Sequence, residues 1–100
     1  MNITFQSILG KYMIIGITYL NKKGNIIKRE QFYGKVIISD ERRGIVIRRE
    51  KTGEELEFPP ILDSIEKAKP GEYTLKSTGE VIMNPDLLST WIIEQRRYNV

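Results

Sequence analysis

Residues 40–58, DERRGIVIRREKTGEELEF, carry the pattern that decides the fold. Two stretches in which apolar and charged residues alternate are separated by the polar sequence EKTG. Alternation with a period of two is typical of a β-strand with one buried face, and a polar stretch that contains glycine is typical of a turn. The stretch therefore predicts short strands at residues 44–49 and 54–58, joined as a β-hairpin.

The register of this hairpin follows from the length of its loop. If residues 50–53 form the loop, Arg49 faces Glu54, and pairing continues along both strands from there. The preceding loop, residues 40–43, joins the hairpin to an upstream strand with Ser39 opposite Gly44. Both registers place the same apolar side chains on one buried face, as a real sheet requires. The predicted core residues are Val36, Ile38, Ile45, Ile47, Leu56 and Phe58, and the predicted exposed residues are Arg48, Glu55 and Glu57.

The basic residues of this stretch divide between the two faces of the hairpin. Arg48 and Arg49 are adjacent, so their side chains point to opposite sides of the strand, and each lies across from a glutamate. Opposite charges paired across strands contribute about 0.2–1 kcal/mol, which explains these arginines without a ligand. Arg42 and Arg43, at the turn, remain free to reach a phosphate backbone. We interpret the cluster as the solvated face of a hairpin and keep Arg42 and Arg43 as candidate nucleic-acid contacts.

One apolar spot lies on the outer face of this hairpin. In the predicted register, Ile37 faces Val46 there. The two side chains are either ordinary surface aliphatics or are covered by another element or a second copy of the chain. Both alternatives stay open, and the pair is a candidate interface.

The other segments predict further strands. Tyr12–Leu20 is apolar on both alternating faces, as in a strand that is buried on both sides. Residues 26–39 are extended, and Gly34 in their middle indicates a bulge or a sharp bend. Residues 72–76 and 81–83 predict a second hairpin, and residues 89–95, STWIIEQ, predict a last strand.

Short helical turns are expected at three places. Residues 1–9 predict a short helix that begins at a capping Asn or Thr and ends before Gly10. The apolar spacing in residues 61–65 resembles that of a helical turn, and Pro85 is suited to start another over residues 87–88. These turns are too short for a doubly wound α/β fold. We expect one domain, residues 1–100, that is mostly β and forms a small barrel or a rolled antiparallel sheet.

The last predicted strand has an edge that little charge protects. An unpaired edge invites another strand, so residues 89–95 are expected either to close the barrel against Tyr12–Leu20 or to pair with a second protomer across a two-fold axis. Ile92 and Ile93 point to opposite faces. One of them should therefore line the contact while the other enters the core, and both are candidate interface residues.

The composition excludes several kinds of chemistry. The sequence has no Cys and no His, which removes disulfides, thiolate catalysis, zinc sites built on these residues and imidazole acid–base catalysis. The carboxylates form no metal-ligand spacing and no catalytic pair, and Ser77 and Thr78 have no accompanying base. We therefore expect no catalytic residues, no metal and no cofactor, and we do not expect an enzyme.

Charge and hydropathy restrict the surroundings of the chain. A net charge of +3 and a pI of about 9.2 permit an anionic partner without requiring one. The first twenty residues lack a basic start and a small-residue cleavage site, and Tyr12–Leu20 is too short to span a bilayer. The sequence thus predicts a cytoplasmic protein that does not contact membranes.

Two resemblances add to these expectations. The segment FYGKVIISDERRGIVIRREKTGEELEFPP, residues 32–60, resembles the middle of small SH3-like and Sm-like barrels, which share a bent strand with G-K-V, an acidic turn and a G-I-V-I strand. This resemblance implies an SH3-like (Sm-like) barrel. Separately, LEFPP, PGEYTLKSTGEVIMNPD and TWIIE look like an uncharacterised family of short bacterial proteins, which implies no activity.

The expected function is that of a non-catalytic binding or assembly module of the bacterial cytoplasm. Its expected partner is another protein or a second copy of itself, for example in a homodimer. The alternative is an RNA-binding Sm-like protein that uses Arg42 and Arg43.

Overall fold

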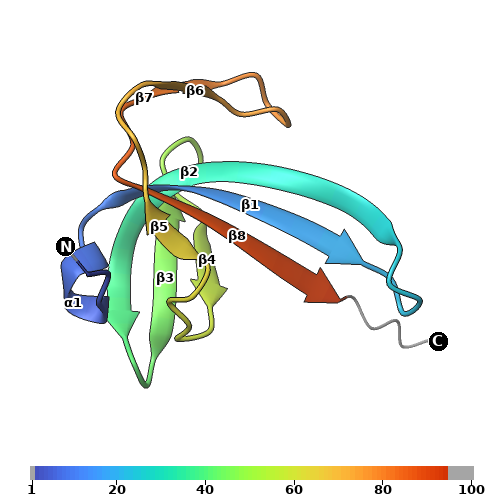
Figure 1. Ribbon diagram of the computed structural model, residues 1–100, viewed down its shortest axis with the longest axis horizontal. Helices are drawn as coiled ribbons and strands as arrows, with labels where there is room; N and C mark the ends of the chain where they lie inside the picture. The colour runs from blue at the N-terminus through green and yellow to red at the C-terminus, as the bar shows by residue number, and fades with distance from the viewer. Residues whose placement is uncertain (1, 95–100) are drawn as a thin grey trace.

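The computed structural model describes residues 2–94, most of which belong to one strongly curved sheet (Figure 1). Six strands form this sheet in the order β4-β3-β2-β1-β8-β5, and β6 and β7 form a separate hairpin. The elements are α1 (Phe5–Ile8), β1 (Tyr12–Leu20), β2 (Ile26–Asp40), β3 (Gly44–Arg49), β4 (Glu55–Phe58), β5 (Ile65–Lys67), β6 (Glu72–Thr74), β7 (Val81–Met83) and β8 (Leu87–Glu94). The mostly β prediction is confirmed. The sheet is mixed rather than antiparallel, because β8 runs parallel to β1.

The hairpin register predicted from the sequence is confirmed between β3 and β4, where Ile47 pairs with Leu56 and Arg48 with Glu55. Between β2 and β3 it is confirmed only as far as Val36, which pairs with Ile47. Beyond that point the pairing shifts by one residue, because a bulge at residue 37 adds an unpaired residue to β2.

The bulge changes the predicted core at one position. Ile38 pairs with Val46 instead of Ile45 and is only half-buried, so its assignment to the core is wrong. Val36, Ile45 and Ile47 are fully buried, as predicted. Of the other predicted core residues, Phe58 is buried and Leu56 is half-buried, while Arg48, Glu55 and Glu57 are exposed.

The curvature of the sheet brings its distant strands together on the inner face. The rings of Phe58 on β4 and Trp91 on β8 lie 4.9 Å apart between centroids, although three strands separate them in the sheet order. Gly34 permits this bend. It pairs with Met13 on one side and Arg49 on the other, and a Cβ there would clash with the Arg48 carbonyl oxygen. The main core forms inside the curve, from Ile8, Met13, Ile15, Ile17, Phe32, Val36, Ile45, Ile47, Phe58, Ile65, Leu87 and Trp91.

The sheet is rolled but open. Within residues 2–94 no strand pairing joins β4 to β5, so a closed barrel is not found. Of the two alternatives expected for residues 89–95, the pairing with β1 is present as far as Glu94, which lies opposite Leu20, but it does not close a barrel; Gln95 lies outside the described residues. No helix in the described part of the chain is long and apolar enough to cross a membrane.

The helical predictions succeed at one place and fail at two. Thr4 caps α1 in a reciprocal capping box with Ser7, and the chain then turns at Gly10 with a φ of 81°. Residues 61–65, however, form a loop that leads into β5, and residues 87–88 begin β8. Tertiary pairing holds Ile65 and residues 87–88 in strands instead of helical turns, since Ile65 lies opposite Ser89 and Leu88 lies opposite Glu66. Local apolar spacing did not reveal that pairing.

The predicted second hairpin, β6–β7, is confirmed and lies over the outer face of the sheet (Figure 1). We use outer face for the side of β1 that carries Ile14, Gly16 and Thr18. A small second core forms where the hairpin meets this face. Its buried residues are Ile14, Leu75 and Ile82, and Tyr33, Tyr73 and Leu88 pack against them.

Candidate ligand-binding groove

Gly16 leaves a gap in the outer face of the central strand. It lies between Gln31 on β2 and Thr90 on β8. A glycine inside a strand weakens it, so its presence needs a reason. Backbone geometry does not supply one, since its φ is not positive and a Cβ would come no closer than 3.8 Å to its nearest neighbour, the carbonyl oxygen of Ser89. The missing side chain therefore leaves open space rather than relieving a clash.

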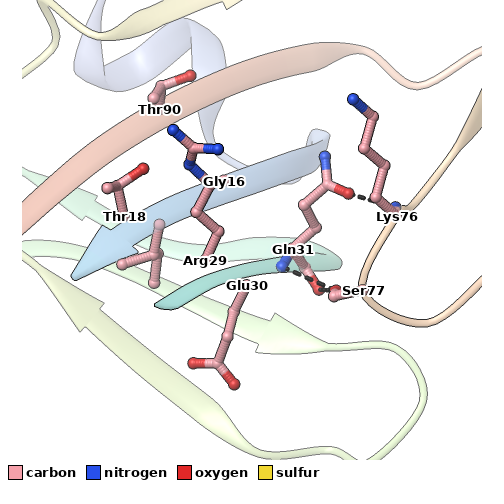
Figure 2. A pocket seen from close by; sticks show the side chains of 9 residues that line it. Gly16, Thr18, Arg29, Glu30, Gln31, Lys76, Ser77 and Thr90 are labelled. Carbon is pink, nitrogen blue, oxygen red and sulfur yellow. Dashed lines mark hydrogen bonds between the residues drawn. The ribbon is translucent and has the colours of Figure 1, made fainter. Parts of the chain in front are cut away.

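This open space is the floor of a groove between the sheet and the β6–β7 hairpin. Two hollows of about 500 and 240 Å³ share Gly16, Gln31 and Thr90 in their walls, so they adjoin each other. The larger one is the polar mouth, lined by Gly16, Ile17, Thr18, Arg29, Glu30, Gln31, Lys76, Ser77 and Thr90 (Figure 2). The smaller one is the inner end, where Ile14, Tyr73, Leu75 and Leu88 contribute apolar surface. We call the two together the Gly16 groove.

Gln31 fixes the tip of the hairpin above the groove. Its backbone amide donates to Ser77 Oγ at 3.0 Å, and Ser77 Oγ donates back to the Gln31 carbonyl at 3.3 Å. The amide of Lys76 donates to the Gln31 side-chain oxygen (Figure 2). Leu75, only 1% exposed, anchors the same turn in the second core. Lys76 is thereby held at the mouth of the groove.

The mouth of the groove is electropositive. Arg29 and Lys76 take part in none of the ion pairs found in residues 2–94, which are Lys28–Glu30, Arg48–Glu55 and Arg49–Glu54. In Figure 2 the Arg29 guanidinium extends over Gly16 toward Thr90.

The carboxylate that lines the mouth, Glu30, does not cancel this charge. Its side chain points away from the other lining residues (Figure 2). The Glu30 carboxylate lies 3.7 Å from Lys28 Nζ. It also faces Tyr19, whose pKa is raised by burial and by a hydrogen bond to Glu30. The Glu30 carboxylate therefore interacts with Lys28 and Tyr19 on the inner face of the sheet and not with the cations of the groove.

The residues that line the mouth are suited to holding an anion. The mouth presents a guanidinium, an ammonium and the hydroxyls of Thr18, Ser77 and Thr90. Charged donors of this kind hold carboxylates and phosphates strongly, and an apolar inner end adds contact with a hydrocarbon part. Within the described residues no group of three His, Cys, Asp or Glu side chains could hold a metal ion.

The arginines singled out in the sequence lie elsewhere. Arg42 and Arg43 are exposed at the β2–β3 turn and do not line the groove. Their backbone amides donate to Asp40 Oδ1 at 2.6 and 3.0 Å, and these bonds lower the pKa of the Asp40 carboxyl. The predicted cross-strand ion pairs of Arg48 and Arg49 are confirmed, at 3.6 and 3.0 Å.

The candidate interface residues fall into two groups. The predicted pairing of Ile37 with Val46 is wrong, because Val46 pairs with Ile38 and Ile37 is the unpaired residue of the bulge. Val46 is buried and Ile37 is half-buried, so neither forms an open apolar spot. Ile92 and Ile93 are 70% and 38% exposed, so the prediction that one of them enters the core is wrong. Trp91 fills the core in their place, because it lies on the inner face opposite Ile17.

Sequence reasoning missed Gly16, Arg29 and Lys76. The one available signal was a glycine that interrupts an otherwise apolar strand. Comparison with protein-family models, with curated proteins and with solved structures gives no match to this chain. The function is therefore inferred from the chemistry of the groove itself.

Proposed function

We propose that this protein is a non-catalytic binding module that holds an amphipathic anion in the Gly16 groove. The observation that carries the proposal is that two cations which form no ion pair within residues 2–94, Arg29 and Lys76, line the same hollow, and that the adjoining hollow has apolar walls. The mouth alone, about 500 Å³, lies within the range of roughly 300–1,000 Å³ that is usual for small-molecule sites.

Each part of the groove has a distinct role in this proposal. Arg29 supplies a planar fork that binds a carboxylate or phosphate through two hydrogen bonds, and Lys76 adds a point charge from the opposite wall. Thr18 and Thr90 donate hydroxyl hydrogen bonds beside Gly16. The hydrocarbon part of the ligand displaces water from the apolar inner end.

The resemblance to SH3-like barrels belongs to the same proposal. Two features support an opened relative of such a barrel: a long bent β2 that pairs with both β1 and β3, and the contact between Phe58 and Trp91 across the rolled sheet. A cytoplasmic place of action is also proposed, on the ground that the sequence contains no Cys. RNA binding through Arg42 and Arg43 is the alternative function.

The proposal is tested with ligands that share one alkyl chain and differ in the head group. Octyl phosphate, octanoate, octanol and octylamine are titrated by calorimetry. We expect the two anions to bind, octanol to bind more weakly and octylamine not to bind. Equal affinity for octanol and octyl phosphate would show that the cations play no part.

Two variants and a control locate the site. A Cβ at Gly16 comes no closer than 3.8 Å to its nearest neighbour, the Ser89 carbonyl oxygen. Gly16→Val should therefore fill the floor and keep or raise stability, because valine favours strands. Arg29→Gln should lose about 10–100-fold in anion affinity, since a hydrogen bond to a charged group contributes about 1.5–3 kcal/mol. Arg48→Gln removes an exposed cation outside the groove and should have no effect. Unchanged binding of octyl phosphate by Gly16→Val contradicts the proposal.

A further inference from the structure

Strand β8 has one free edge in the described part of the chain. Its other edge pairs with β1 along its full length. On the free side, β5 reaches only residues 87–89, and the Thr90 amide donates to the Ser64 carbonyl at 3.3 Å. From there to Glu94 no strand is paired with this edge (Figure 1).

The groups that point outward follow from the Thr90 bond. Backbone groups alternate between the two sides of a strand, so the amides and carbonyls of Ile92 and Glu94 face the same side as the Thr90 amide. Unpaired edges of this kind invite another strand, and proteins usually protect them with charge, proline or a bulge. This edge carries Ile92, which is 70% exposed, and one charged residue, Glu94.

We propose that β8 of a second copy of this chain pairs antiparallel with this edge across a two-fold axis. The position of Ser64 sets the register. Ser64 already occupies the place next to Thr90, so the register that pairs Thr90 with Glu94 of an incoming strand is excluded. The next register along the edge remains possible. It pairs Ile92 of one copy with Glu94 of the other, and Ile93 with Ile93. Each Ile92–Glu94 pair then exchanges two backbone hydrogen bonds.

In this register, the side chains of a second copy of the chain complement those along the free edge of β8. It sets the half-exposed Ile93 against the same side chain of the other protomer, on the face that carries Trp91 and Tyr19. Apolar surface is removed from water on both sides at once. The two Glu94 carboxylates lie opposite isoleucines rather than each other, so like charges do not meet. A contact this short implies a dimer that dissociates on dilution.

Single-cysteine crosslinking tests the register, because the sequence contains no Cys. Positions 93 face each other as a non-hydrogen-bonded pair, with Cα atoms about 4.5 Å apart, which is within the range of a disulfide. We expect Ile93→Cys to form a disulfide dimer under mild oxidation faster than Ile92→Cys and Val81→Cys. These two controls replace side chains that are more exposed, at 70% and 51%. A rate for Ile93→Cys no higher than either control overturns the proposal.

Association itself is measured by sedimentation equilibrium on the full chain. The mass should rise from 11.7 kDa toward twice that value with concentration. Ile93→Lys should give a folded monomer with an unchanged circular dichroism spectrum, because it places like charges opposite each other. Val81→Lys should still associate, and so should Gly16→Val, which separates this proposal from the groove. A wild-type protein that stays monomeric up to about 1 mM overturns it.

Discussion

Gly34 and Gly16 both lie inside central strands, for different physical reasons. A Cβ at Gly34 would clash with the Arg48 carbonyl oxygen and lie 2.8 Å from Ile47 Cγ2, whereas a Cβ at Gly16 would meet nothing closer than 3.8 Å. We expect Gly34→Ala to lower the free energy of unfolding by about 1–3 kcal/mol, since overpacking forces the strands apart. Gly16→Ala, the matched control, should leave it unchanged or raised. Urea denaturation measures both, and equal losses would contradict this distinction.

Asp40 gives the β2–β3 turn a defined pH dependence. The amides of Arg43 and Arg42 donate to its carboxylate, so its pKa in the folded state lies below the ordinary value of 3.8. The charged form is favoured by folding. Its stabilising effect is therefore complete above the unfolded pKa and is lost as the pH falls through the folded pKa.

Asp40→Asn tests this dependence. At about pH 7 the variant should melt at a lower temperature than the wild type. Between pH 4 and pH 2 the difference should shrink, because protonation removes the charge that the variant lacks. Glu41→Gln changes a neighbouring charge in the same turn and serves as the control. A difference in melting temperature that stays constant down to pH 2 would contradict this, and would mean that the charge of the Asp40 carboxylate does not stabilise the turn.

Among the strands, β3 supplies the centre of the inner face of the sheet. Ile47 has no exposed surface and lies between β2 and β4 in the main core. Truncation should leave a cavity, and Ile47→Ala is expected to cost about 2–5 kcal/mol in urea unfolding. Val81→Ala, at a half-exposed position on the hairpin, should cost under about 0.5 kcal/mol. A loss at Ile47 as small as this would mean that the register of β3 is wrong.

The elements that sequence predicted well are those whose partners are near in the chain. The β3–β4 register follows from alternation and loop length, and both lie within one stretch of sequence. The bulge at residue 37 was not predicted, because residues 37 and 38 are both isoleucine and the alternation of apolar and polar residues does not show which one is extra. Strand β5 is three residues long and exists through pairing with β8, a contact that local spacing does not reveal.

The candidate groove could not be predicted from the sequence either, because its walls come from segments that are distant in the chain. Arg29 and Lys76 belong to different hairpins and meet because β6–β7 lies over the outer face. The parallel pairing of β1 and β8, which sets Thr90 beside Gly16, is likewise a tertiary choice. The sequence did contain the gap itself, as a glycine within Tyr12–Leu20, but not the walls around it.

The positive charges of the molecule are distributed over separate sites and do not form one continuous basic surface. The net charge is +3, yet Arg48 and Arg49 are paired with glutamates. Arg42 and Arg43 project from the β2–β3 turn beside Asp40 and Glu41, while Arg29 and Lys76 sit in the groove. Phosphate affinity scales with the number of cations that one nucleic acid engages at the same time. We therefore expect single-stranded RNA to bind weakly even at low salt.

The RNA alternative makes a different and quantitative prediction for the same turn. If Arg42 and Arg43 each neutralise one phosphate, replacing both by alanine should flatten the slope of log affinity against log salt by about 1.4, or roughly 0.7 for each contact on single strands. Fluorescence anisotropy with a labelled oligouridylate measures the slope. Arg29→Gln is the control, because its guanidinium belongs to the groove, and it should leave the slope unchanged. Wild-type protein that shows no RNA affinity at about 20 mM salt excludes the alternative, since electrostatic binding is strongest there. A slope that falls with Arg29→Gln instead would place the RNA in the Gly16 groove, with its phosphate as the anion.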